Sequence, residues 1–147
     1  FRLPNVFSKS QYITLFDRGK DFKRSNHLIV LLTNAFAEDG ELSLDHERNL
    51  YKKILTEHKV THVIRHPREK YSKLDRGNYQ VMKEVRISEE IILDLAKENN
   101  VSVIGTYSTV LLNLSSVKGV EIINYPIKLG KPTKYLDVIF NEICGHD

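Results

Sequence analysis

Four short runs of apolar, largely β-branched residues constrain the fold of this chain more than any other feature. Runs of about four to eight such residues are typical of strands that are covered on both faces of a sheet. The runs are His27 to Leu32, Val60 to Arg65, Val101 to Gly105 and Val120 to Ile123. Helical patterns separate and follow them, at Asp45 to His58, Ser88 to Glu98, Thr109 to Ser116 and from Thr133 onward. This alternation predicts an α/β fold with a Rossmann-like parallel sheet and helices on both faces.

The remaining segments are interpreted around this alternation. Residues 1–26 scatter aromatic residues among polar ones, so we predict a connecting segment there, with a short strand at Tyr12 to Phe16. Residues 27–147 then form a single domain, a size that buries a substantial core. Gln80 to Val85 is predicted as a short edge strand.

The helical patterns predict caps and buried faces as well. Ser43 or Asp45 is expected to cap the first helix, and Ser88 the second, which Asn99 and Asn100 end. The buried face of the first helix is predicted to carry Leu50, Tyr51, Ile54 and Leu55. The buried stripe of the last helix is predicted to carry Tyr135, Val138, Ile139 and Ile143.

Composition narrows the class of protein. The chain has 147 residues and a formal net charge of +3, a mild bias that suits an anionic small ligand or an acidic membrane surface and argues against a nucleic-acid partner. Cys144 is the single cysteine, which excludes an internal disulfide and favours a reducing compartment. No apolar run reaches the roughly 20 residues needed to span a bilayer. Phe1 to Lys9 lacks the apolar core of a signal peptide, and without an initiator Met we expect the chain to be a piece of something longer.

The loops that follow the predicted strands are the places to look for chemistry, because parallel sheets bind ligands beyond the carboxyl ends of their strands. The first loop contains Glu38-Asp39-Gly40, in which Gly40 permits a tight turn with positive φ. Two acids before a glycine are also typical of a solvated turn. The position above a strand end favours a functional role for Asp39.

The second loop places His66 among cations. Pro67 keeps His66 extended, and Arg65, Arg68 and Lys70 add positive charge. An imidazole in this setting donates a hydrogen bond to a bound phosphate. A solvent-exposed basic turn explains the same residues equally well.

Two helix starts supply further candidates. Gly105 allows close backbone approach, and Ser108 and Thr109 bring hydroxyls and free amides to the start of the next helix, which suits a phosphate. An ordinary helix cap needs only one of these hydroxyls. Glu90 lies in the first turn of its helix, where an acid suits the helix dipole or holds a ribose diol.

Several common motifs are missing from the sequence. It contains no Gly-x-Gly-x-x-Gly and no phosphate-binding loop of the Walker type, which argues against the usual dinucleotide and ATP sites. It also lacks an Asp-x-Asp metal motif and histidines at metal-ligand spacing, so no metal is expected. No cofactor is expected either.

The ordered set Glu38-Asp39-Gly40, His66-Pro67 and Ser108-Thr109, with Ile87-Ser88-Glu89-Glu90 between them, resembles the bacterial family 52 glycosyltransferases, which include lipooligosaccharide sialyltransferases. The resemblance covers roughly residues 28–113. It implies a GT-B architecture, in which two Rossmann-like domains face each other across a cleft. The present chain then corresponds to the C-terminal donor half, without the N-terminal acceptor domain.

The resemblance also implies a reaction and a role for each residue. The reaction is an inverting, metal-independent transfer of sialic acid from the donor substrate CMP-sialic acid to a terminal galactose of a bacterial surface glycan. Asp39 becomes the general base, and His66 assists the departing phosphate. The donor-binding residues become Gly40, Pro67, Glu90, Ser108 and Thr109, with Glu90 on the ribose and the last two on the phosphate.

The resemblance leaves some alternatives open. A cytoplasmic location is expected, and peripheral attachment at the inner membrane and a homodimer are compatible with it. The alternative outside the enzyme class is a non-catalytic nucleotide- or partner-binding domain of the same fold. A glycosyltransferase that uses another nucleotide sugar is a further alternative within the enzyme class.

Overall fold

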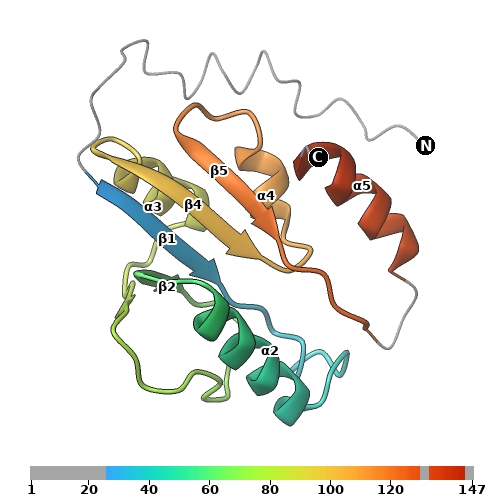
Figure 1. Cartoon of the computed structure of the whole chain (residues 1–147). Helices are drawn as coiled ribbons and strands as arrows, with labels where there is room; N and C mark the ends of the chain where they lie inside the picture. Colours follow the sequence, from blue (N-terminus) through green and yellow to red (C-terminus); the bar gives the residue numbers. More distant parts are fainter. Residues whose placement is uncertain (1–25, 130–132, 145–147) are drawn as a thin grey trace.

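The computed structural model describes residues 26–129 and 133–144, which form a five-stranded parallel sheet with helices on both faces (Figure 1). The sheet order is β3-β2-β1-β4-β5. The strands are β1 (Asn26–Leu32), β2 (His62–Ile64), β3 (Gln80–Val81), β4 (Asn99–Gly105) and β5 (Val120–Asn124). The helices are α2 (Leu44–Glu57), α3 (Ser88–Leu95), α4 (Thr109–Leu114) and α5 (Lys134–Cys144). The predicted Rossmann-like α/β fold is confirmed.

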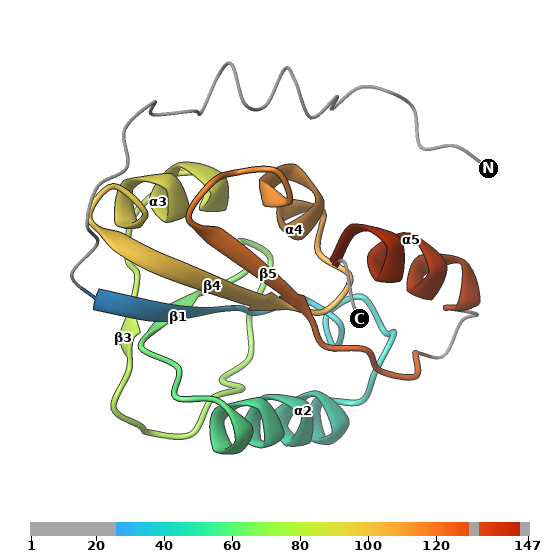
Figure 2. The ribbon, with the colours of Figure 1, turned by 45° about the horizontal axis from the view of Figure 1, so that its top comes forward.

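The sheet divides the core into two layers (Figure 2). Alternate residues of the central strands face opposite sides, so Val30 and Val103 pack toward α3 and α4 while Leu31 and Ile104 pack toward α2. All four side chains are fully buried. The apolar runs are therefore continuous because both faces of the central strands are covered.

α2 follows its predicted pattern closely. Ser43 is the N-cap, and its hydroxyl accepts a 3.2 Å hydrogen bond from the His46 amide. Leu50, Tyr51 and Ile54 are buried against the sheet, as the apolar stripe predicts. The helix begins at Leu44 and ends at Glu57.

The segments around α3 correct three predictions. Ile87, not Ser88, holds the N-cap position, without a side-chain cap hydrogen bond, and Ser88 is the first helical residue. Asn99 and Asn100 begin β4, because they pair with the start of β1, although the Asn99 side chain also donates to the Leu95 carbonyl at the end of α3 at 2.9 Å. The predicted edge strand 80–85 is reduced to Gln80–Val81, since the chain leaves the sheet after the Met82 amide bonds the Val63 carbonyl at 2.9 Å.

The buried stripe predicted for α5 is wrong at Tyr135 and Val138, whereas Ile139 and Ile143 are partly buried. Tyr135 and Val138 are 50% and 53% exposed, and the face that meets the core carries Leu136, Phe140 and Cys144. Phe140 is nearly fully buried and makes an edge-to-face contact with Tyr107, with ring centroids 5.6 Å apart. The docking of this one ring fixes the rotation of the helix, which its many apolar residues leave ambiguous.

Two further predictions fall on residues that the structure does not describe. The strand at Tyr12 to Phe16 and the connecting segment 1–26 lie outside the described residues, apart from Asn26, which begins β1. Among the helices that the structure does describe, none combines the length and the apolar character needed to cross a bilayer.

The strand order places a topological switch point between β1 and β4. From β1 the chain proceeds outward through β2 and β3, and then returns to the other side of β1 with β4 and β5. Sheets of this kind bind ligands outside the carboxyl ends of the two strands at the switch point. The loops at that edge are therefore the natural site.

Candidate functional site

The loops after β1 and β2 are joined through Thr33, which is buried at the end of β1. Its amide donates to the Ile64 carbonyl at 3.1 Å, and its hydroxyl accepts from the His66 amide at 3.1 Å. The same hydroxyl donates to Glu69 at 2.7 Å. These hydrogen bonds connect the two loops where His66 leaves the sheet.

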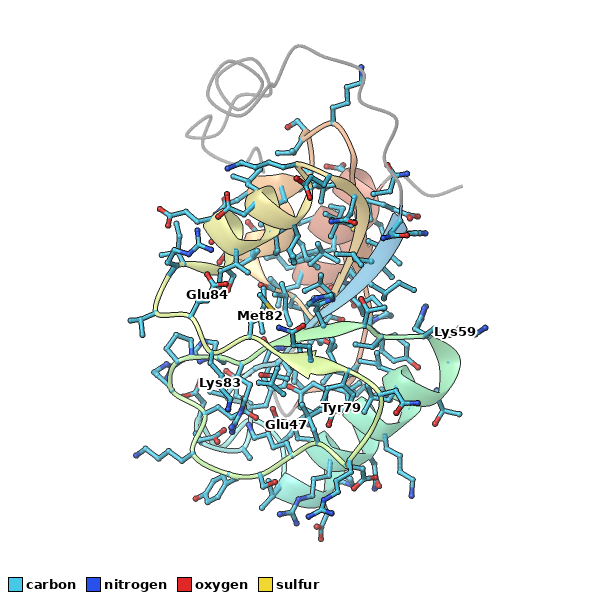
Figure 3. All side chains as sticks on the ribbon, turned by 90° about the vertical axis from the view of Figure 1, so that its left-hand side faces the viewer. Glu47, Lys59, Tyr79, Met82, Lys83 and Glu84 are labelled. Carbon is cyan, nitrogen blue, oxygen red and sulfur yellow. The ribbon has the colours of Figure 1, made fainter. Side chains whose placement is uncertain are left out.

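A buried lysine makes a second connection between the loops after β1 and β2. Lys73 Nζ lies 2.6 Å from Glu38 and 2.9 Å from Glu47, and it donates to the Asn34 carbonyl at 2.8 Å. Glu47 comes from α2. In Figure 3, which views the molecule from the β3 edge, Glu47 appears inside the loop that joins β2 to β3. Since a buried charge is costly without partners, this cluster fixes the first loop, the second loop and α2 in one arrangement.

Tyr51 completes the buried cluster from α2. Its hydroxyl donates to Glu47 at 2.9 Å and accepts from the Asn34 amide at 2.7 Å. Burial and the neighbouring Glu47 carboxylate raise the pKa of Tyr51 well above its ordinary value, so the hydroxyl keeps its proton. The cluster thus reaches the loop after β1 through a neutral hydroxyl, which accepts the hydrogen bond from the Asn34 amide.

Glu38 is a structural anchor, not a solvated turn residue. It accepts from the amides of Lys70 at 2.7 Å and Tyr71 at 3.2 Å, in addition to its contact with Lys73. Burial alone would raise its pKa, but these hydrogen bonds lower the pKa from 4.5 to about 2. The carboxylate is therefore held ionised between the two loops.

Asp39 sits on the turn that Glu38 anchors. The predicted left-handed conformation of Gly40 is confirmed, with φ of 72°, and the Asp39 amide donates to the Ala35 carbonyl at 2.8 Å. Both carboxylate oxygens of Asp39 receive N–H groups of the Arg68 guanidinium, and the Nη2–Oδ2 distance is 2.9 Å. The Asp39 side chain is 31% exposed and that of Arg68 is 64% exposed. The candidate base thus lies at the surface of the site.

His66 has one defined protonation state in this setting. Its Nδ1 accepts a 3.1 Å hydrogen bond from the Arg68 amide, which places the proton of the neutral ring on Nε2. Burial and the nearby Arg68 guanidinium lower the pKa of His66 below its ordinary 6.5. At neutral pH the ring is therefore an uncharged donor at Nε2. Pro67, which follows it, is exposed.

The third predicted loop lies after β4. Ser108 is the N-cap of α4 and accepts from the Val110 amide at 3.2 Å, and Thr109 is exposed. Tyr107 adopts a positive φ of 51°, rare for an aromatic residue, and its amide donates to Asn124 at 2.8 Å. Asn34 donates to the Thr106 carbonyl at 2.9 Å and so ties this loop to the one after β1. Backbone strain of this kind clusters at functional sites.

The predicted residues are brought together to different degrees. Asp39 and His66 share Arg68 as a partner, and Asn34 links their loops to the loop of Ser108. Glu90 is exposed in the first turn of α3, and within the described residues no hydrogen bond joins it to the others. Its neighbour Glu89 accepts a 2.7 Å hydrogen bond from Asn113 of α4.

Sequence reasoning missed the residues that hold the site together, namely Thr33, Glu47, Glu69 and Lys73. A pattern was available for one of them. Glu47 precedes Leu50 by three positions and Tyr51 by four, so it falls on the apolar stripe of α2. A charged residue on such a stripe predicts a buried ionic partner, though not which one.

Comparison with known proteins places this arrangement in a family. No curated protein matches the chain. Residues 1–129 match the family model described as glycosyltransferase family 52, which covers most of the chain. Members of such a family transfer a sugar from a nucleotide-sugar donor to a glycan acceptor. The fold, the loops at its switch point and this match lead to one conclusion: the chain belongs to glycosyltransferase family 52.

Proposed function

We propose that this chain is the donor-binding half of a sialyltransferase that uses CMP-sialic acid. The observation that carries the proposal is the meeting of Asp39 and His66 on two joined loops at the switch-point edge. A carboxylate and an imidazole that donates a hydrogen bond are the two groups that a displacement at an anomeric carbon requires. The acceptor is a terminal galactose of a bacterial surface glycan.

The reaction assigns one role to each of the two groups. The acceptor hydroxyl attacks the anomeric carbon on the face opposite the phosphate, and Asp39 takes the hydroxyl proton as the new C–O bond forms. The bond to the phosphate breaks, and its electron pair leaves with CMP. Because one displacement occurs, the configuration at the anomeric carbon is inverted.

His66 acts on the leaving phosphate. Its Nε2–H is free of the intraloop hydrogen bond that occupies Nδ1, so it is the atom that donates to the phosphate oxygen. Charge grows on this oxygen as the bond breaks, and a donor fixed in advance stabilises the transition state more than the ground state. The proposed transfer relies on this donor and needs no metal; Arg65, on the same loop, is already paired with Glu69 at 3.2 Å.

The remaining donor contacts follow the family resemblance. Ser108 and Thr109 hold the phosphate from the loop after β4, and Glu90 holds the ribose hydroxyls from the start of α3. Gly40 and Pro67 shape the two turns that carry Asp39 and His66. The acceptor is bound by a second Rossmann-like domain in a GT-B arrangement.

Nucleotide binding by this chain tests the proposal. Calorimetry with EDTA present should detect CMP binding in preference to UMP and GMP. Because hydrogen bonds to charged groups are strong, the double variant Ser108→Ala, Thr109→Val should lose about tenfold to a thousandfold in CMP affinity. Thr56→Val, on exposed α2 surface, is the matched control and should bind CMP normally.

Each alternative predicts a different calorimetric result. Preference for UMP or GMP would point to another nucleotide-sugar donor. Absence of binding to any nucleotide would favour a non-catalytic partner-binding module and would contradict the proposal.

A further inference from the structure

The Arg68–Asp39 ion pair occupies the carboxylate that the proposed function assigns to proton removal. Both oxygens of Asp39 receive N–H groups of one guanidinium, so an acceptor hydroxyl has to compete with Arg68 for them. We propose that the Arg68 guanidinium blocks Asp39 until an anion of the donor displaces it, and we call this arrangement the latch. The phosphate or carboxylate of the donor draws the guanidinium away and leaves Asp39 available. This inference rests on the proposed function.

The loops do not need the Arg68 side chain to stay together. Thr33 joins them at the end of β1, and the buried Lys73 joins them again through Glu38. These joints are buried, whereas Arg68 is 64% exposed. The guanidinium can therefore leave Asp39 while the turn that carries Asp39 keeps its place.

The backbone of Arg68 serves a separate purpose. Its amide holds Nδ1 of His66, and this bond does not depend on where the guanidinium points. The side chain can change partner while the imidazole keeps its tautomer. Arg68 thus orients His66 through its main-chain amide and controls Asp39 through its guanidinium.

The energetics suit an exchange of partners. An exposed ion pair shifts an equilibrium by no more than roughly fivefold. The planar fork of a guanidinium accepts a phosphate in the same bidentate geometry as a carboxylate. A donor anion bound by Ser108 and His66 competes effectively for Arg68, because its other contacts already hold it in place. No covalent bond changes in this step, and the guanidinium keeps all its protons.

The latch gives the reaction an order. Without the donor, Asp39 is paired and an acceptor hydroxyl meets an occupied carboxylate. With the donor bound, the anion and Arg68 form the new pair, and Asp39 turns to the acceptor. Donor binding therefore precedes productive acceptor binding.

A double-mutant cycle on CMP binding tests the latch. Calorimetry would compare wild type, Arg68→Gln, Asp39→Asn and the double variant. Arg68→Gln should weaken CMP binding by about tenfold, because a charge-assisted bidentate contact is lost. Asp39→Asn should tighten CMP binding by about two- to fivefold, because Arg68 no longer has to leave a carboxylate. Arg76→Gln removes the same charge from an exposed position of the same segment, which lines a cavity with Lys52 and Thr56 of α2, and should change affinity less than about twofold.

The decisive comparison is Asp39→Asn in the two backgrounds. The latch requires that the tightening disappear when Arg68 is already Gln. Equal tightening in both backgrounds would mean that Asp39 merely repels the anion, and it would overturn the latch. Binding of both CMP and CMP-sialic acid without any coupling would overturn the latch alone, whereas absence of CMP binding in wild type would overturn the proposed function with it.

Three ligands identify the anion that opens the latch. Cytidine carries neither charge and should show no coupling. Coupling with CMP assigns the phosphate to Arg68, and coupling with CMP-sialic acid but not with CMP assigns the sugar carboxylate. Absence of coupling with both charged ligands would refute the proposal.

Discussion

The main-chain amide of Arg68 donates a 3.1 Å hydrogen bond to Nδ1 of His66, two residues before it. This short-range contact decides which nitrogen of the imidazole faces the site, and it sits beside the guanidinium that holds Asp39. The candidate acid and base are therefore organised by a single residue that sequence reasoning recognised only as one of several nearby cations.

Asp39→Asn should lower the transfer rate of the active enzyme by at least about a hundredfold, because the amide keeps the shape of the side chain but cannot take a proton. The turnover number, measured with saturating donor, checks this. Glu98→Gln, an exposed change at the far end of the α3 segment, is the control. A turnover number within a fewfold of wild type would remove Asp39 from the role of base.

The His66 ring should titrate below pH 6.5, since burial and Arg68 both oppose its protonation. Arg68→Gln removes one of these two effects and should raise the pKa of His66 toward 6.5. NMR of the ring protons against pH measures both values. If a normal or raised pKa is found in wild type, the neutral-donor role of His66 is wrong.

Lys73→Met should destabilise the chain by about 3–5 kcal/mol, because it leaves the carboxylates of Glu38 and Glu47 buried without their shared cation. Urea denaturation measures the loss. Lys52→Met, at an exposed position of α2, should cost less than about 0.5 kcal/mol. A comparably small loss for Lys73→Met would mean that the cluster does not hold the loops.

Glu38 should contribute stability that depends on acid pH. Its pKa falls from 4.5 to about 2 on folding, so the contribution is complete above pH 4.5 and is lost as the pH falls toward 2. The free energy of unfolding of wild type should therefore approach that of Glu38→Gln over this window. A difference between the two proteins that stays constant from pH 6 to the acid limit would contradict the lowered pKa.

Phe140→Ala should cost about 3–5 kcal/mol, because it empties the space where α5 docks against Tyr107. Val138→Ala removes apolar atoms from the same helix at a half-exposed position and should cost less than about 1 kcal/mol. Thermal or urea denaturation of the two variants compares them directly. Similar losses would show that the stripe of α5 is not the one found here.

The sheet was predictable because strands that are buried on both faces appear as continuous apolar runs in the sequence. Such runs can be recognised without knowing which elements pack against them. The rotation of α5 was not predictable, since Tyr135, Val138 and Ile139 compete with Phe140 and only the Tyr107 ring decides among them. The start of β4 was missed for a similar reason. Asn99 and Asn100 have poor strand propensity, but hydrogen bonding to β1 overrides it.

The candidate site was likewise predictable in part: its loops were, and the partners of its residues were not. Positions at strand ends located the loops of Asp39, His66 and Ser108 in advance, because topology places those ends at one edge. The partners could not be predicted, since Lys73 meets Glu38 across 35 positions and Arg68 meets Asp39 across 29. Short sequence patterns carry no information on contacts that only the folded loops create.

The segment from Arg65 to Tyr79 leads from the end of β2 to the start of β3 without a helix, and it packs Leu74 and Tyr79 against the α2 side of the core. The segment that presents His66 and Arg68 thus also covers that side of the sheet, together with α2. Grafting a different loop here to change donor preference would remove Leu74 and Tyr79 from this shared cover. Engineering of specificity in this protein should therefore begin at exposed positions after β4, such as Thr109, and should keep Tyr107, whose ring packs against Phe140 of α5.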